Sequence, residues 1–215
     1  MGDNAALFMT VFVLLVIFAG YFYFEKSSLG TKEIAIIATL SAFAAICRLP
    51  FAAIPNVQPT TFIVAISGYA FGPYAGFLVG STTAFVSNIF LGQGPWTPWQ
   101  MFAWGLVGAL SGLIGRRKQG GMSVLAFSMV CFLYGFMFDW IMNLWHVLGF
   151  IKPLTLKAIM LAYLTGLTVD IMHACGNFVF SMIFFEKFYK VLLRSKRRLQ
   201  ITYIGNDNKQ YEGEK

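Results

Sequence analysis

Residues 5–24 read AALFMTVFVLLVIFAGYFYF, an apolar run that contains no charged side chain. A helix that spans the hydrocarbon core of a bilayer needs about 20 such residues. Asp3 precedes the run where a secretory signal carries basic residues, and large aromatic residues follow it instead of a small-residue cleavage site. We therefore predict that residues 5–24 form a retained transmembrane helix.

The rest of the chain continues this apolar pattern. Of its 215 residues, 58% are hydrophobic and 12% are charged, whereas a soluble domain is about 45–50% apolar and about 25% charged. Further apolar runs cover residues 34–47, 60–71, 74–91, 98–115, 122–145 and 159–185. This composition excludes a soluble enzyme, a disordered chain and a secreted disulfide scaffold. It predicts an all-α integral membrane protein: an accessory helix and linker over residues 1–30, six helices over 31–190, and a basic, polar tail over 191–215.

The positions of the basic residues predict the orientation, because Lys and Arg accumulate in short cytoplasmic loops. With the N-terminus outside, Arg48, Lys152 and Lys157 fall on the external side. The cytoplasmic side receives Lys26, Lys32, Arg116, Arg117, Lys118, Lys187, Lys190, Arg194, Lys196, Arg197, Arg198, Lys209 and Lys215. We predict a multi-pass plasma-membrane protein with its C-terminus in the cytoplasm. The net charge of +7 then reflects topology and not nucleic-acid binding.

The basic run over residues 187–198 has two interpretations. It is either an anchor on anionic lipids or a docking strip for a cytoplasmic partner. The polar residues 201–215 that follow carry no predicted secondary structure.

Small residues recur at helical spacing and predict close helix packing. They are Gly72, Gly76 and Gly80 in one segment and Gly105, Gly108, Gly112 and Gly115 in the next. Two similar steps, Ala38/Ala42 and Ser41/Ala45, lie side by side in the 34–47 run. Each step either packs inside the bundle or presents a flat face to another protein.

Polar side chains inside the membrane predict a binding site, because they are costly unless they face a cavity or a partner. Two sets each share one helix face: Asp139, Asn143 and His146 near the external surface, and Asp170, His173 and Asn177 near mid-membrane. Trp145 adjoins the first set.

The external loop over residues 91–101 is the third candidate binding feature. Its prolines stiffen it, Trp96 and Trp99 offer apolar plates, and Gln93 and Gln100 offer amide groups. The tryptophans belong either to an interfacial aromatic belt or to a lid over a small-molecule pocket.

Catalytic motifs are absent from the sequence, which has no HExxH, GxSxG or P-loop pattern. Cys47, Cys131 and Cys175 sit in apolar runs without metal-ligand spacing. We predict no enzyme activity, no metal and no cofactor. The catalytic alternative is a metal-dependent membrane enzyme that uses His146, His173, Asp139 and Asp170.

Residues 31–190 resemble the substrate-binding S component of energy-coupling factor (ECF) vitamin transporters. The resemblance rests on the Ala38/Ala42 step and on four motifs: Asn56-Val-Gln-Pro-Thr-Thr61, Gly68-Tyr-Ala-Phe-Gly-Pro73, Phe85-Val-Ser-Asn88 followed by Gly92-Gln-Gly-Pro-Trp-Thr-Pro-Trp-Gln-Met-Phe102, and His173-Ala-Cys-Gly-Asn177. The 92–102 loop is most similar to the cobalamin-type members.

This resemblance implies a function. S components bind a vitamin from outside, associate with a membrane coupling subunit and two ATPase subunits, and release the vitamin inside. It implies that Ala38 and Ala42 contact the coupling subunit and that cobalamin or a corrinoid precursor is bound. The residues expected to contact the ligand are Asn88, Gln93, Trp96, Trp99, Gln100, Asp139, Asn143, His146, Asp170, His173 and Asn177. Riboflavin or another vitamin is the alternative ligand, and a scaffold protein whose polar groups only pair internally is a further alternative.

Overall fold

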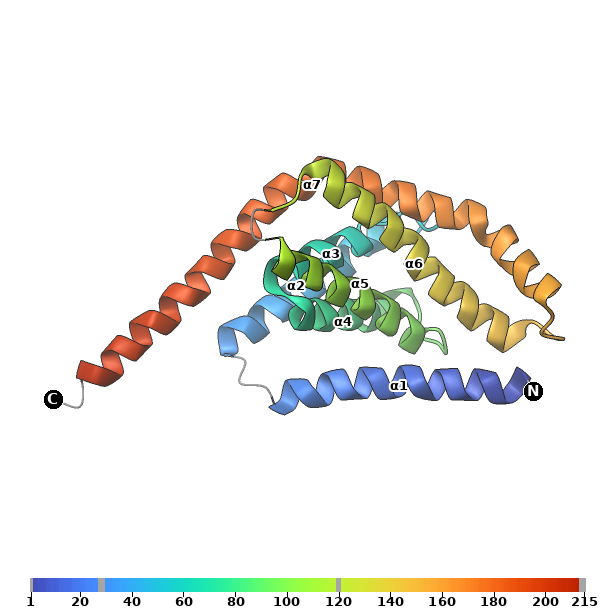
Figure 1. Ribbon diagram of the computed structural model, residues 1–215, viewed down its shortest axis with the longest axis horizontal. Coiled ribbons are helices and arrows are strands. Elements are labelled where there is room, and N and C mark those ends of the chain that lie inside the picture. The colour runs from blue at the N-terminus through green and yellow to red at the C-terminus, as the bar shows by residue number, and fades with distance from the viewer. Residues whose placement is uncertain (1, 27–29, 119–120, 213–215) are drawn as a thin grey trace.

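The computed structural model describes residues 2–26, 30–118 and 121–212, and the side chains of residues 4–26, 30–118 and 121–198. The described part is built from helices, as predicted for an all-α membrane protein. They are α1 (Gly2–Lys26), α2 (Thr31–Arg48), the short 3₁₀ helix η1 (Leu49–Phe51), α3 (Thr60–Phe71), α4 (Pro73–Leu91), α5 (Thr97–Arg117), α6 (Val124–Phe150) and α7 (Leu156–Glu212) (Figure 1). The accessory helix and the six-helix bundle are therefore confirmed.

The break between α3 and α4 depends on two residues. Gly72 has φ +103°, a backbone conformation that side chains disfavour, and Pro73 occupies the first turn of α4. The spacing of Gly72, Gly76 and Gly80 predicts that all three lie on one helix. The structure corrects this, because Gly72 forms the junction that separates two short helices.

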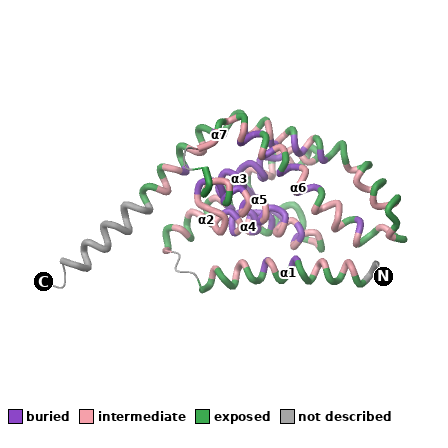
Figure 2. Tube along the Cα trace, in the orientation of Figure 1, coloured by how far each residue is buried: buried purple, intermediate pink, exposed green. Residues whose placement is uncertain are grey.

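Helix α3 is the centre of the bundle. Every residue from Thr60 to Ala70 is buried, so α3 is covered on all sides by its neighbours (Figure 2). With 12 residues it is about 18 Å long, shorter than the roughly 30 Å hydrocarbon core. Its polar N-terminal residues, Thr60 and Thr61, therefore lie inside the protein, farther from the membrane surface than the ends of the longer helices.

Helices α4 and α5 pack backbone to backbone through the predicted glycines. A Cβ atom added to Gly108 would lie 2.0 Å from the carbonyl oxygen of Gly76, and one added to Gly80 would lie 2.1 Å from that of Trp104. Gly68 extends the contact to α3, since its added Cβ would lie 2.0 Å from the Gly108 oxygen. The prediction of close helix packing by small residues is confirmed.

The accessory helix α1 lies along the bundle (Figure 1). The Tyr21 hydroxyl bonds to Ser81 Oγ at 3.0 Å and Thr82 Oγ1 at 2.8 Å on α4. Val13 and Ile17 are buried against Trp99 at the start of α5. Most other side chains of α1 are exposed, which suits a helix with one face on the bundle and the other in lipid.

The last helix is longer than predicted. Helix α7 passes residue 190 without a break and ends at Glu212, so it enters the segment for which the sequence predicts no secondary structure. In its basic run, the Lys196 ammonium donates to the Ala70 carbonyl at the C-terminal end of α3 (2.7 Å), where a cation is favourable. Lys215 and the side chain of Lys209 lie outside the described residues.

Candidate functional site

Polar side chains converge at one end of the bundle. The C-terminal ends of α2 and α4 meet there with the N-terminal ends of α3 and α5, and α6 and α7 contribute residues from their interiors. In the predicted orientation this is the external end. We call the connected side chains described below the outer-end network.

The first part of the outer-end network is a chain of buried hydrogen bonds. His173 Nδ1 lies 2.9 Å from Asp139 Oδ2, and His173 Nε2 lies 2.9 Å from Thr61 Oγ1. The indole Nε1 of Trp104 donates to Thr61 Oγ1 at 2.9 Å, and Asn56 Nδ2 donates to Asp139 Oδ1 at 2.8 Å. The chain is complete if Thr61 donates its single proton to Nε2 and the Nδ1–H group donates to Asp139.

A second carboxylate lies nearby on α7. Asn143 Nδ2 donates to both oxygens of Asp170, at 3.4 and 3.2 Å, and Asp170 is 3% exposed. The two predicted helix faces therefore meet, because Asp139 pairs with His173 and Asn143 pairs with Asp170. Two of the three members of each predicted polar set thus find a partner on the other helix.

Two of the predicted residues stand apart from these pairs. His146 is exposed and stacks on Phe150 at 5.4 Å, so it does not join the other three residues of the predicted metal alternative. Asn177 is fully buried and donates to the His173 carbonyl one turn earlier at 3.0 Å, while its own Oδ1 has no partner.

Arg48 forms the second part of the outer-end network. Its Nε donates to Gln58 Oε1, and its Nη1 donates to Ser87 Oγ and Asn88 Oδ1, each at 2.8 Å. The guanidinium carbon lies 4.9 Å from the centre of the Trp104 ring, which joins this cluster to the first chain. One arginine thus ties together the end of α2, the 52–59 loop and the end of α4.

The predicted loop continues this cluster. Asn88 Nδ2 donates to Gln100 Oε1 at 2.7 Å and to Thr97 Oγ1 at 3.1 Å. Gln93 accepts from the Thr97 hydroxyl at 2.9 Å and donates to the Phe85 carbonyl at 2.9 Å. The amides of Gln93 and Gln100 therefore fix the shape of the loop and its attachment to α4.

The two tryptophans of the loop point to different neighbours. Trp96 is half-buried and lies edge-on to Trp145 of α6, with 6.2 Å between the ring centres. Trp99 is 2% exposed, packs with Val13 and Ile17 of α1, and leaves its Nε1 without a partner. The two rings therefore do not form a single aromatic lid over the outer-end network.

Sequence reasoning missed several members of the outer-end network. Asn56, Gln58 and Thr61 stand in a motif that the resemblance already used, but they were not proposed as site residues. Arg48 was counted only as an external charge. The sequence did contain an indication that Arg48 has a role in the site. Arg48 lies at the external end of an apolar helix, whereas most basic residues of the chain lie at the cytoplasmic side.

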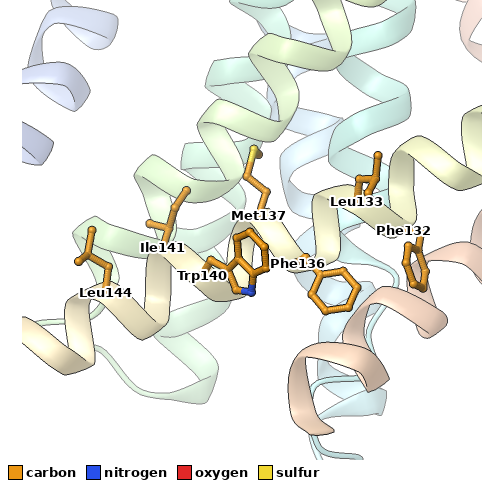
Figure 3. Close-up of a pocket in the computed structure, with 7 residues that line it drawn as sticks. All are labelled: Phe132, Leu133, Phe136, Met137, Trp140, Ile141 and Leu144. Carbon is orange, nitrogen blue, oxygen red and sulfur yellow. The ribbon is translucent and has the colours of Figure 1, made fainter. Parts of the chain in front are cut away.

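Helix α6 also carries an apolar groove of about 580 Å³ on its surface (Figure 3). It is lined by Phe132, Leu133, Phe136, Met137, Trp140, Ile141 and Leu144. Leu133 is 61% exposed and Trp140 is 53% exposed, as expected for side chains that face lipid. No member of the predicted polar sets lines this groove.

The two small-residue steps of α2 face opposite ways. Ser41 and Ala45 are buried, and the Ser41 carbonyl accepts from Thr83 Oγ1 of α4 at 3.4 Å. Ala38 and Ala42 are exposed, beside Ile46, which is 61% exposed. Only the Ala38/Ala42 step is free to meet another protein.

Comparison with known proteins identifies the family. The model of the family described as "ECF transporter, substrate-specific component" matches residues 32–195. A UPF0397 protein of Vibrio atlanticus is 30% identical over 46% of this chain and 60% of its own length. A UPF0397 protein of Aliivibrio fischeri strain MJ11 is 33% identical over 40% of this chain and 49% of its own length.

The chain thus spans between about half and three fifths of the length of these curated relatives. No solved structure matches it. The family model covers helices α2 to α6 almost completely, together with most of α7, and therefore includes the whole outer-end network. The chain belongs to the family of substrate-specific components of ECF transporters.

Proposed function

We propose that this protein is the vitamin-binding S component of an ECF transporter and that the outer-end network forms its binding site. The observation that carries the proposal is the convergence of Asp139, His173 and Asn88, which are far apart in sequence, in one connected network. Ionisable and polar groups buried inside a membrane bundle are costly, and they commonly mark a substrate or ion pathway.

The chemistry of the network fits a small organic ligand. Asn56, Gln58, Asn88 and Gln100 supply amide donors and acceptors, and Trp96 and Trp145 supply aromatic walls. Binding sites for small molecules usually combine apolar walls with a few placed polar groups. A corrinoid ligand, cobalamin or a precursor, presents a rim of amides that matches this set.

The second part of the proposal concerns transport. Ala38 and Ala42 provide the contact with a membrane coupling subunit, and two ATPase subunits supply the energy. Their exposure on α2 supports this role, because small exposed side chains allow a second helix to approach closely. The ligand enters from outside, where the outer-end network lies in the predicted orientation.

The binding proposal is tested by calorimetry on the purified protein. The panel contains cyanocobalamin, dicyanocobinamide, riboflavin, thiamine, biotin, folate and pantothenate. We expect one class of ligand to bind, and we expect Asp139→Asn to weaken its binding at least tenfold, because Asp139 organises both His173 and Asn56.

The outcomes separate the alternatives. Binding of riboflavin alone would keep the S-component function and replace the corrinoid. Absence of binding to every member of the panel by folded protein would refute the vitamin-binding function.

A further inference from the structure

Arg48 is a cation whose partners are all neutral. Its bonds reach the side chains of Gln58, Ser87 and Asn88, and its guanidinium stacks on Trp104. Among the described residues, no carboxylate lies within ion-pair distance of it. Asp139, the carboxylate of the same network, is already engaged by His173 and Asn56.

This arrangement leaves the Arg48 guanidinium without a direct ion-pair partner among the described residues. Its surroundings are buried, since Gln58 is 9% exposed, Asn88 1% and Trp104 0%. Arg48 itself is half-buried, so its guanidinium loses part of its solvation, which neutral hydrogen bonds only partly restore. The carbonyl groups at the C-terminal end of α2 contribute a partial negative charge of about one half. Asp139 and Asp170 of the same network bond to other side chains, so the guanidinium itself keeps no direct counter-ion among the described residues.

The geometry also leaves one hydrogen-bonding group of Arg48 free. The bonds use Nε and Nη1, and no described atom of the protein accepts from Nη2. The stacked ring and the three buried acceptors hold the guanidinium plane in place. A fixed guanidinium with a free edge binds an anionic oxygen without further ordering.

We propose that Arg48 binds an anionic group of the transported ligand, a carboxylate or a phosphate ester. This inference rests on the proposed function and specifies its ligand. Among corrinoids it favours cobalamin, which carries a phosphodiester, over precursors such as cobinamide that lack one. The ligand then supplies the ion-pair partner that no described side chain gives to Arg48.

A purely structural role for Arg48 makes a different prediction. If Arg48 only ties α2 to α4 and the 52–59 loop, its loss weakens every ligand to the same extent. If it binds an anion, its loss weakens only ligands that carry the anion. The two roles are therefore compared with two corrinoids, of which only cobalamin carries the phosphodiester, together with the nucleotide that it links to the ring.

The experiment measures calorimetric affinities of cyanocobalamin and dicyanocobinamide for the wild type, Arg48→Gln, Arg48→Lys and Arg116→Gln. We expect Arg48→Gln to weaken cyanocobalamin at least tenfold more than dicyanocobinamide, the loss expected for one charged hydrogen bond. Arg48→Lys retains part of the selectivity. Arg116→Gln, at the opposite end of α5, changes neither affinity.

A second variant tests the charge while Arg48 stays in place. Asn88→Asp puts a carboxylate where the Asn88 oxygen already accepts from Arg48 at 2.8 Å. The new carboxylate pairs with Arg48 but cannot donate to Gln100 and Thr97 as Asn88 Nδ2 does, so we expect the fold to be kept by a turn of the Gln100 amide that lets its nitrogen donate instead. We also expect its loss of cyanocobalamin affinity to exceed its loss of dicyanocobinamide affinity at least tenfold. It carries the test alone if Arg48→Gln does not fold.

Several results would overturn the inference. One is equal weakening of both ligands by Arg48→Gln and Asn88→Asp. Another is a panel in which only a ligand without an anionic group, such as riboflavin, binds; this would leave the vitamin-binding function intact. If no vitamin binds at all, the proposed function fails, and this inference fails with it.

Discussion

At the scale of single residues, the Thr61 hydroxyl is the smallest group on which the outer-end network depends. It accepts from Trp104 and bonds to His173, and all three side chains are fully buried. Replacement by valine keeps the shape but leaves two buried polar groups without partners, at about 1–3 kcal/mol each. We expect Thr61→Val to lower the free energy of unfolding by about 2–4 kcal/mol, measured by denaturation in detergent.

Thr61→Ser is the matched control for this prediction. It keeps the hydroxyl and removes one methyl group, so we expect it to cost less than about 1.5 kcal/mol. Equal losses for the two variants would show that the hydroxyl does not hold the indole and imidazole rings together.

The residues of the site were only partly predictable from the sequence, and the reason is physical. Helical spacing correctly grouped Asp139 with Asn143 and Asp170 with His173, because each pair shares a helix face. It could not reveal that Asp139 pairs with His173, since that contact depends on how α6 and α7 pack. Arg48 was overlooked because its three partners come from two distant segments.

At the scale of helices, α1 stabilises the start of α5. Val13 is 1% exposed within the cluster that contains Trp99, whereas the next residue, Leu14, is 47% exposed. We expect Val13→Ala to destabilise the protein by about 1–2 kcal/mol through the cavity that it leaves beside Trp99. Leu14→Ala should change stability by less than about 0.5 kcal/mol. Thermal unfolding of both variants in the same detergent gives the comparison.

The interface of α4 and α5 makes a stronger prediction. A Cβ atom at Gly108 would lie 2.0 Å from the Gly76 carbonyl, whereas one at Gly149 of α6 meets nothing within 4 Å. Gly108→Ala should therefore lower the free energy of unfolding by at least about 1–3 kcal/mol, because two backbones must separate. Gly149→Ala should be neutral or slightly stabilising, since alanine is the better helix former.

The helices themselves were more predictable than the contacts between them. The apolar runs located each of the helices α1 to α7 but not the short η1, and the 60–71 run matches α3 at both ends. What the runs could not show was the centre of the bundle, because α3 is as apolar as its neighbours and only the packing reveals that it is buried on all sides. The end of α7 was missed because residues 201–212 have a polar composition.

At the scale of the whole molecule, the orientation in the membrane remains a prediction from the basic residues. Lys157 at the start of α7 and Lys118 after α5 are both exposed and lie at opposite ends of the bundle. In a background without Cys47, Cys131 and Cys175, an impermeant maleimide should label Lys157→Cys in intact cells. It should label Lys118→Cys only after permeabilisation. The reverse pattern would place the outer-end network on the cytoplasmic side.

Transport requires that binding and coupling use separate surfaces of the molecule. Ala38 and Ala42 lie on the exposed face of α2, away from the outer-end network, so bulky side chains there should leave the ligand site intact. We expect Ala38→Trp combined with Ala42→Trp to keep the ligand affinity within about twofold and to lower cellular vitamin uptake at least tenfold. A tryptophan pair prevents close approach of a second helix. Copurification with the coupling subunit should fall in parallel.

Leu164→Trp on α7 is the control, because Leu164 is 68% exposed and contributes no polar contact to the network. This variant should retain both binding and uptake. Unchanged uptake in the Ala38/Ala42 variant would move the coupling surface to another face, while a loss of ligand affinity in it would mean that α2 transmits changes from its exposed face to Arg48. Only loss of uptake with binding preserved fits a protein in which one end of the bundle holds the vitamin and one side of α2 meets the coupling subunit.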